Sequence, residues 1–355
     1  MASKQLQSAD RQLVVPYENV QNVCICVVMY PLLQYLLLND LEVCKSHTAY
    51  ILDETISEKI RNKLPCYTFK EYPQTAFYKV WRKIVRTFQA LTRDIRHPYL
   101  KTATIYAQDH DIVSILIGKH DYYLLQDAPN IYTALATDGC VQTMLKLKKQ
   151  RSLRGKIEEA VYGTPFVYHH GNNDQCKKIF LTEENEAPIL KEKNYVVNSL
   201  KDLWVDANEE KRKFILDLFD VSSNDLQLLQ SRPIVFFSQP MADLLSEQEY
   251  VELLEKIFRH YDRSQLLIKT HPRDHFDYGN HFPDIALFDK PVNVELLSVL
   301  NLSFKKAVTI YSAAVFSLPE SIELDWFGAN IHPKIYAVSG SAETKLPRSY
   351  NQMTL

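Results

Sequence analysis

The chain has 355 residues, of which 46% are hydrophobic and 24% are charged, and its formal net charge is −2. This length and composition are typical of a globular protein with two domains, and the near-neutral charge argues against a nucleic-acid partner. With only 8 glycines, the chain contains no GxGxxG or GxxxxGK[ST] loop, which excludes a glycine-rich nucleotide site.

The N-terminal region predicts neither a signal peptide nor a membrane span. Residues 1–18 are polar and are expected to form a flexible leader. The longest apolar stretch, residues 20–38, is interrupted by Asn22, Pro31 and Gln34, which is typical of a strand followed by a helix. The six cysteines form no metal-ligand pattern and are expected to be free thiols, so we predict a cytoplasmic location.

The next part of the chain alternates short apolar strands with helices. A long helix is predicted over residues 78–96, with Trp81, Ile84, Val85, Phe88, Leu91 and Ile95 on one face and basic residues on the rest. The predicted strands lie at 20–28, 48–52, 67–69, 104–106 and 122–125. This alternation favours a parallel sheet with crossover helices.

A second alternating series begins after a polar, charged segment, residues 181–230, which we interpret as a linker with a helix. Its predicted strands lie at 234–237, 265–269, 285–288 and 307–310, and Ser246 with Glu249 predicts a capping box for the helix 246–261. We therefore expect an α/β protein with two Rossmann-like domains. The N-terminal domain, on the acceptor side, covers residues 19–180, and the C-terminal nucleotide-sugar domain covers residues 231–355.

Polar residues that directly follow strands are candidates for ligand binding, because open parallel sheets bind ligands at the carboxyl ends of their strands. Lys269, His271 and Arg273 follow one predicted strand, and such a cluster suits a nucleotide phosphate, although a solvated loop is the alternative. Ser312 follows another strand, either as an anion ligand or as a plain helix cap. Gln239 is a further polar residue of this kind and follows a third predicted strand.

The order of these motifs resembles that of bacterial sialyltransferases. Lys-x-His-Pro at 269–272 follows a strand, Pro-x-x-x-Glu occupies 291–295, and Tyr-Ser-Ala at 311–313 follows a later strand. Residues 25–38 also resemble the opening of those enzymes. On these motifs the chain is similar to glycosyltransferase family 52, the lipooligosaccharide sialyltransferases, and to the capsule polysialyltransferases. The resemblance implies the GT-B architecture, in which two Rossmann-like domains face a central cleft.

The resemblance also implies roles for individual residues. His271 matches the general acid that faces the CMP phosphate, and Ser312 matches the first phosphate-binding serine. Ala313 stands where a second serine often lies, so one hydrogen bond to the phosphate is in question. The further residues expected at the nucleotide are Lys269, Pro272, Gln239 and Glu295.

The carboxylate–carboxylate–Gly motif that supplies the catalytic base in those enzymes falls on Gln126-Asp127-Ala128. Gln126 cannot accept a proton near neutral pH. Three alternatives remain open. Either Asp127 acts as the base, or Asp138 takes this role, or the chain is an altered or inactive member of the family. We prefer Asp127, because Pro129 restricts its loop, whereas Asp138 belongs to an Asp-Gly pair typical of a turn. A turn is also the alternative for Asp127.

Together, the implied function is inverting transfer of sialic acid, or a related ulosonic acid, from a CMP-sugar to a glycan hydroxyl of a bacterial surface polysaccharide or lipooligosaccharide. No cofactor is expected, and no metal, because the leaving group is a monophosphate and His169-His170 lacks ligand spacing. The alternatives are a GT-B transferase with another nucleotide-sugar donor, or a non-catalytic capsule-assembly protein that lost its base.

Two clusters of basic residues, within 79–96 and 146–156, have no place in this chemistry. One interpretation is that they form solvated helix faces. The other is a docking surface for acidic glycans or for the inner membrane, which would make the protein peripheral to that membrane. Phe77, Tyr78 and Trp81 beside the first cluster favour membrane contact.

Overall fold

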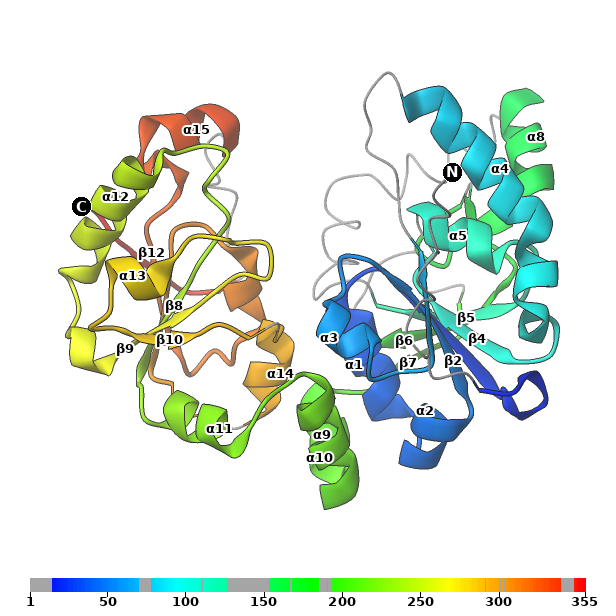
Figure 1. The fold of residues 1–355 in the computed structure, drawn as a ribbon, viewed down its shortest axis with the longest axis horizontal. Helices are drawn as coiled ribbons and strands as arrows, with labels where there is room; N and C mark the ends of the chain where they lie inside the picture. The colour runs from blue at the N-terminus through cyan, green and yellow to red at the C-terminus, as the bar shows by residue number, and fades with distance from the viewer. Residues whose placement is uncertain are drawn as a thin grey trace, which may run out of the picture. The chain divides into compact units, whose positions relative to one another are not determined.

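The protein consists of two compact units, and the first ends at Ile215 and the second begins at Leu216. A computed structural model describes residues 15–69, 78–109, 111–126, 153–166, 168–184, 190, 193–290, 292–300, 302, 304–339 and 348–355. Each unit is built on one sheet of parallel strands, as Figure 1 shows. The expected architecture of two Rossmann-like α/β domains is confirmed.

The first unit contains a seven-stranded sheet in the order β3-β2-β1-β4-β5-β6-β7. Its strands are β1 Asn22–Cys26, β2 Thr48–Asp53, β3 Cys66–Phe69, β4 Thr104–Ala107, β5 Tyr122–Leu125, β6 Cys176–Leu181 and β7 Tyr195–Val197. Its described helices are α1 Met29–Leu38, α2 Leu41–Ser46, α3 Glu58–Arg61, α4 Tyr78–Arg96, α5 Asp111–Ile117, α8 Leu153–Tyr162 and α9 Leu200–Asp206, followed by α10 Glu209–Leu218, which crosses into the second unit.

Strand β1 explains why the first sheet forms where it does. All five of its residues are buried, since it lies at the centre of the sheet and pairs with both β2 and β4. A strand covered on both faces is expected to be apolar throughout, which the sequence NVCIC nearly satisfies. Pro31 lies in the first turn of α1, where it removes no helical hydrogen bond.

The second unit contains a six-stranded sheet in the order β10-β9-β8-β11-β12-β13. Its strands are β8 Ile234–Phe237, β9 Leu266–Lys269, β10 Ala286–Phe288, β11 Lys306–Thr309, β12 Glu323–Trp326 and β13 Asn351–Gln352. Its helices are α11 Ser223–Gln230, α12 Glu247–Phe258, α13 Tyr278–His281, α14 Val294–Val299 and α15 Pro333–Ser339. The capping box predicted for Ser246 and Glu249 is confirmed at the start of α12.

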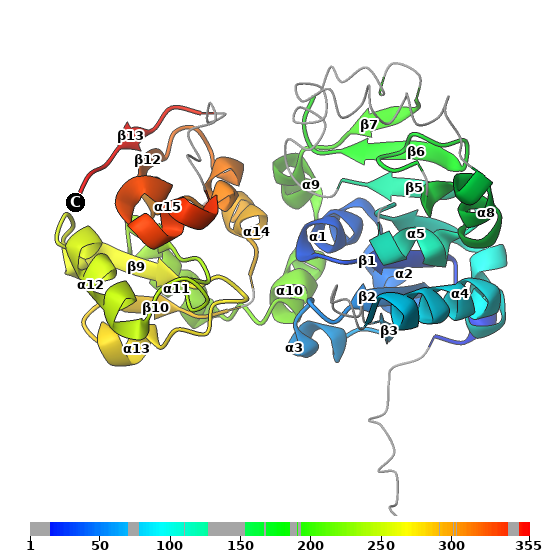
Figure 2. The same cartoon turned by 90° about the horizontal axis from the view of Figure 1, so that it is seen from above.

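The described part of the segment predicted as a linker, residues 181–230, contains one strand and three helices. Its β7 pairs with β6 and extends the first sheet past residue 180, and it also contains α9, α10 and α11. Figure 2 shows β6 and β7 following β5 across that sheet. In the part of the chain that the structure describes, no helix is both long and apolar enough to cross a membrane.

Candidate active site

The carboxyl ends of β8, β9 and β11 bring the predicted nucleotide residues to one edge of the second sheet. Strand β8 lies between β9 and β11, so the ends of these two outer strands are separated by about 10 Å. His271 follows β9, Gln239 follows β8, and Ser312 follows β11. Parallel strands thus place three residues that are far apart in sequence on neighbouring loops.

His271 is held by two hydrogen bonds of its loop. Its backbone N–H donates to the Ser238 hydroxyl at 2.9 Å, and its Nδ1 accepts from the backbone N–H of Arg273 at 3.1 Å. Because Nδ1 is an acceptor, a neutral His271 carries its proton on Nε2. Burial lowers the pKa of His271, and the nearby cations of Arg273 and Lys269 lower it further. The imidazole is therefore set up as a hydrogen-bond donor through Nε2.

Ser238 and Asp274 connect this loop to the interior. The Ser238 hydroxyl donates to Asp274 Oδ2 at 2.6 Å, and the same carboxylate oxygen accepts from the Tyr278 hydroxyl at 2.8 Å. Tyr278 in turn shares a hydrogen bond of 2.7 Å with Tyr250 of α12. Sequence reasoning did not assign a role to Asp274; its position three residues after His271, within the same loop, was the available signal.

Lys269, which the sequence predicts at the nucleotide, lies at the end of β9. Its side chain is buried, and Nζ donates to the carbonyl oxygens of Thr270 and Lys290. Burial lowers its pKa to about 7. Thr270 is fixed as well, because its hydroxyl donates to Asp289 at 2.7 Å. In this arrangement Lys269 ties the loop after β9 to the loop after β10, and its ammonium group already donates two hydrogen bonds within the protein.

Ser312 is a buried residue whose hydroxyl has no hydrogen-bond partner among the described residues. Its backbone N–H donates to the Thr309 hydroxyl at 3.1 Å. The adjacent Tyr311 N–H donates to the side-chain oxygen of Gln239 at 3.0 Å, which joins the loops after β8 and β11. Ala313 is exposed and begins a short 3-10 helix, Ala313–Ser317.

Glu295 and Pro272 complete the predicted nucleotide set. Glu295 lies in the first turn of α14, and its carboxylate accepts from Asn293 at 2.9 Å and from the Ser317 hydroxyl at 2.8 Å. Burial raises the pKa of Glu295. The bond to Ser317 connects α14 with the short helix that follows Ser312. Pro272 is exposed beside His271.

The predicted base cannot be placed in the same way, since Asp127 and Asp138 lie outside the described residues. Gln126, at the position of the missing carboxylate, is only 2% exposed. Its backbone N–H donates to Gln34 at 2.9 Å, and its side-chain oxygen accepts from the Thr182 N–H at 2.8 Å. Gln126 therefore links β5 with α1 and with the end of β6.

Two further observations concern the chemistry of the site. The loop between β8 and α12 carries an exposed carboxylate, Asp243, which sequence reasoning did not assign. Within the described ranges, no group of three His, Cys, Asp or Glu side chains is arranged to hold a metal ion.

Comparison with known proteins identifies the family. The model of glycosyltransferase family 52 matches residues 42–334. An uncharacterized protein of Haemophilus influenzae (strain ATCC 51907 / DSM 11121 / KW20 / Rd) is 31% identical over 269 residues, which cover 75% of this chain and 80% of the relative.

Solved structures share the fold at low sequence identity. The GT-B domain of a sialyltransferase from Photobacterium damselae has a TM-score of 0.56 and 13% identity, over 90% of this chain and 96% of that one. An alpha/beta-galactoside alpha-2,3-sialyltransferase from Photobacterium phosphoreum has a TM-score of 0.50 and 10% identity, over 89% and 94% of the two chains. With a GT-B fold and a family model that matches most of its length, the chain belongs to glycosyltransferase family 52.

Proposed function

We propose that this glycosyltransferase moves sialic acid, or a related ulosonic acid, from a CMP-sugar to a glycan hydroxyl of a bacterial surface polysaccharide or lipooligosaccharide. Two observations together carry the proposal: His271 has Nδ1 occupied and its proton on Nε2, and the hydroxyl of Ser312 has no partner among the residues that the structure describes. Two neutral donors at the same edge of the second sheet suit a monophosphate. Family membership and the fold shared with two sialyltransferases support this choice.

The reaction assigns one task to each group. The base, for which we propose Asp127 before Asp138, accepts the proton of the acceptor hydroxyl. The acceptor oxygen forms a bond to the anomeric carbon while the bond from that carbon to the CMP phosphate oxygen breaks, with inversion. His271 donates its Nε2 proton or a hydrogen bond to the departing phosphate, and Ser312 donates a second hydrogen bond. The transition state has oxocarbenium character.

The other predicted residues support the nucleotide. We propose that Gln239, Pro272 and Glu295 line the site around the nucleoside of the donor. Lys269 acts by holding the loops after β9 and β10, since its ammonium group already donates to two carbonyl oxygens. A monophosphate leaving group carries less charge than a diphosphate, so this set of donors needs no metal ion in the reaction.

The identity of the donor is tested by thermal shift of the full chain with CMP, CDP, UDP and GDP. Ligand at tenfold excess over its dissociation constant stabilises the folded state by about 1.4 kcal/mol. We expect CMP to raise the melting temperature and expect a smaller shift in the Ser312→Ala variant. Protection by UDP or GDP without protection by CMP would show that the donor is a different nucleotide-sugar.

A further inference from the structure

A histidine of the first unit, His169, is held as a hydrogen-bond acceptor. Its Nδ1 lies 2.8 Å from the backbone carbonyl oxygen of Asp109, and a carbonyl oxygen can only accept. Nδ1 therefore carries the proton, and Nε2 of the neutral ring offers a lone pair. This tautomer is the reverse of that of His271, whose Nε2 carries the proton. In the part of the chain that the structure describes, no hydrogen bond occupies Nε2 of His169.

The Asp109 carbonyl places His169 at the carboxyl edge of the first sheet. Asp109 is the second residue after β4, a strand that pairs with both β1 and β5. The preceding Gln108 accepts a hydrogen bond of 2.7 Å from the Val27 N–H, which joins this loop to the end of β1. Open parallel sheets bind their ligands at this edge. The proposed base Asp127 follows β5, the neighbouring strand, by two residues in the sequence.

Asp109 also fixes the turn that begins with His169. His170 and Gly171 have φ values of 56° and 77°, and the Asn172 N–H donates to the His169 carbonyl oxygen at 3.2 Å. The N–H groups of His170 and Gly171 each donate at 2.7 Å to one oxygen of the Asp109 carboxylate. A left-handed conformation is uncommon outside glycine, and His170 keeps it because the buried carboxylate holds the turn.

The same turn contains an unsatisfied amide. Asn172 is 5% exposed, and its Nδ2 has no hydrogen-bond partner among the described residues. A turn of this kind brings its first and fourth Cα atoms within about 7 Å, so Asn172 lies close to His169. A left-handed histidine and an unpaired buried amide both cost stability, and such costs recur at binding sites. They indicate that the position of His169 serves a ligand.

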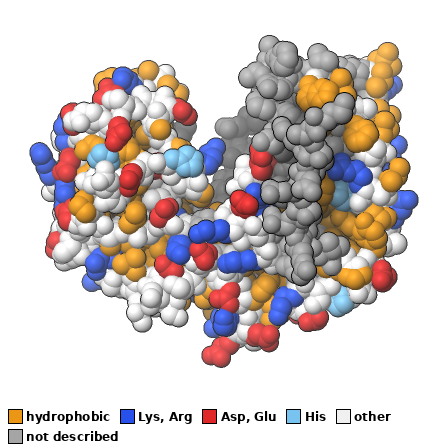
Figure 3. Space-filling model, viewed as in Figure 1, with side chains coloured by type: hydrophobic (Ala, Val, Ile, Leu, Met, Phe, Trp, Pro, Cys, Tyr) orange, Lys and Arg blue, Asp and Glu red, His pale blue; other side chains and the backbone are white. Residues whose placement is uncertain are grey.

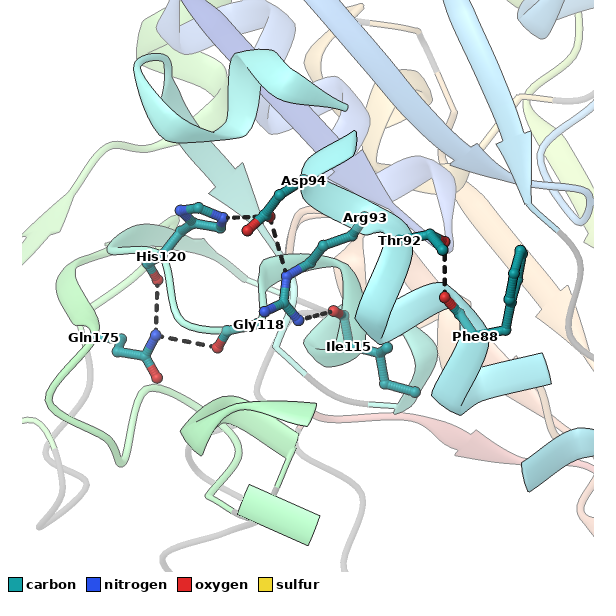
Figure 4. Close-up of polar contacts among 8 residues, drawn as sticks. All are labelled: Phe88, Thr92, Arg93, Asp94, Ile115, Gly118, His120 and Gln175. Carbon is teal, nitrogen blue, oxygen red and sulfur yellow. Dashed lines mark hydrogen bonds and ion pairs between the residues drawn. The ribbon is translucent and has the colours of Figure 1, made fainter. Parts of the chain in front are cut away.

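The other end of the loop, before β6, is anchored separately. Gln175 Nε2 donates to the carbonyl oxygens of Gly118 and His120, both at 3.1 Å, as Figure 4 shows. Gly118 adopts a φ of +63°, and a Cβ atom there would lie 1.9 Å from the Cζ of Arg93. Arg93 is only 7% exposed and donates to the Ile115 carbonyl oxygen of α5 at 3.0 Å. The loop that leads from α8 into β6 is therefore held at this end as well.

These anchors also set the rotation of α4. Asp94 lies 3.3 Å from Arg93 Nε and 2.9 Å from His120 Nε2. Phe88 is directed away from this cluster in Figure 4, and Leu91 is 69% exposed. Figure 3 shows hydrophobic side chains gathered over this part of the first unit. The apolar face of α4 is therefore turned outward, and its polar contacts support the loop of His169.

The chemistry of Nε2 selects the ligand. A lone pair accepts a hydrogen bond, so it suits a hydroxyl group and not a phosphate, whose oxygens are acceptors themselves. A metal ion is the other ligand of a neutral imidazole, but the residues that the structure describes include no group of three His, Cys, Asp or Glu side chains arranged to hold one. Nε2 of His169 therefore fits a sugar, which presents several hydroxyl groups.

We propose that Nε2 of His169 accepts a hydrogen bond from a hydroxyl of the acceptor glycan and so holds the sugar beside the loop that follows β5. This inference rests on the proposed function, which supplies a glycan acceptor, and it adds one contact of that acceptor. It gives His169 no proton transfer, since the base remains the carboxylate proposed above.

Two substitutions separate the two ring nitrogens. Asparagine in His169→Asn can replace the Nδ1 donor to the Asp109 carbonyl but places no atom at Nε2. Glutamine in His169→Gln can place an acceptor oxygen near Nε2. Saturation-transfer NMR measures binding of methyl β-galactoside, methyl β-glucoside and methyl N-acetyl-β-glucosaminide to the full chain without donor. For the glycoside that binds best, we expect at least about tenfold weaker binding in His169→Asn and a change within about threefold in His169→Gln.

His47 provides a matched control. Its Nδ1 also bonds to a backbone carbonyl, that of Asn19 at 2.9 Å, but His47 precedes β2 and lies at the amino edge of the sheet. His47→Asn should bind the glycosides like the unchanged chain. If His169→Asn keeps binding while His169→Gln loses it, His169 only anchors the turn and the inference is wrong. Equal binding by all variants, or no binding of the three glycosides to the unchanged chain, would also overturn it.

The donor is checked separately, by hydrolysis of CMP-N-acetylneuraminic acid by the unchanged chain without glycan. Absence of hydrolysis would count against the proposed function. It would leave the glycan contact to be judged by the binding measurement, which contains no donor.

Discussion

At the scale of single residues, one backbone hydrogen bond decides what the imidazole of His271 can do. The Arg273 N–H occupies Nδ1, so the proton lies on Nε2 and is available to a leaving group. We expect His271→Ala to lower turnover by about 10²–10⁴-fold, the usual range for a general acid. Steady-state kinetics measures this loss. His275→Ala, an exposed histidine of the same loop, is the control and should keep its turnover.

The catalytic base is tested by replacing carboxylates with isosteric amides. We expect Asp127→Asn to abolish transfer while CMP affinity stays within about threefold, because a base contacts the acceptor and little of the nucleotide. Asp138→Asn should have a much smaller effect. Asp243→Asn probes the exposed carboxylate of the β8–α12 loop. If Asp127→Asn keeps full activity while Asp138→Asn or Asp243→Asn loses it, the residue changed in the inactive variant is the base.

His97 links stability to pH. Burial and then the neighbouring Arg96 lower its pKa from 6.5 to about 4, so the folded state resists a proton that the unfolded chain accepts. The free energy of unfolding should therefore fall as the pH drops from 6.5 towards 4, with a slope of up to about 1.4 kcal/mol per pH unit from this group. Urea unfolding across this range should show a smaller slope for His97→Asn. An unchanged slope would assign the acid sensitivity to other groups.

Sequence reasoning located the loop of His271 but not the direction of every side chain in it. A lysine after a strand is equally compatible with a phosphate contact and with burial; only the tertiary structure shows that Lys269 donates to carbonyl oxygens. Gln126 is similar. The sequence marks it as a lost carboxylate, whereas its buried hydrogen bonds to Gln34 and Thr182 show what the amide does in the fold.

At the scale of elements, short apolar runs predicted the central strands of both sheets, while β6 was missed because Lys177 and Lys178 interrupt its apolar pattern. The helix 78–96 was predicted from its periodicity, and α4 confirms it. The periodicity identifies an apolar face but cannot tell whether this face turns to the core or to a partner. In α4 the contacts of Arg93 and Gly118 settle that question.

The anchor of α4 can be tested at Gly118. Gly118→Ala adds a Cβ at a φ of +63° and displaces the Arg93 guanidinium, so we expect a loss of at least about 2 kcal/mol in the free energy of unfolding. Gly279→Ala is the control, because its nearest neighbours lie 3.8 Å or more from the added atom. It should change stability little. Equal effects of the two variants in urea unfolding would contradict the role assigned to the Arg93 contact.

At the scale of the whole molecule, the motif order predicted the GT-B architecture, and the family model and the shared fold confirm it. The boundary between the two units was harder to predict, because β7 is only three residues long and the helices α9 and α10 after it are rich in charged residues. Burial against the first sheet, which a local pattern does not reveal, decides where that unit ends.

The division into two units allows the nucleotide site to be mapped by hydrogen exchange. We expect CMP to slow exchange of backbone amides in the loops after β8, β9 and β11, since the proposed phosphate contacts lie there. Amides of β1 and β2 in the first unit serve as the internal reference and should not change. Protection confined to the first unit would place the nucleotide on the opposite sheet from the one proposed.

The parallel pairing of every described strand has a consequence for how the chain reaches its native state. Strand β1 pairs with β2 and also with β4, and Asn22 is joined to Thr104 in that register. No hairpin between neighbouring strands exists among the described pairs to act as a local nucleus, so each contact requires closure of a long loop. On the ribosome, β1 leaves the exit tunnel well before its second partner is made. Nascent chains should therefore expose apolar strand edges for a long interval, and slower synthesis at low temperature or added chaperones should improve the yield of folded protein.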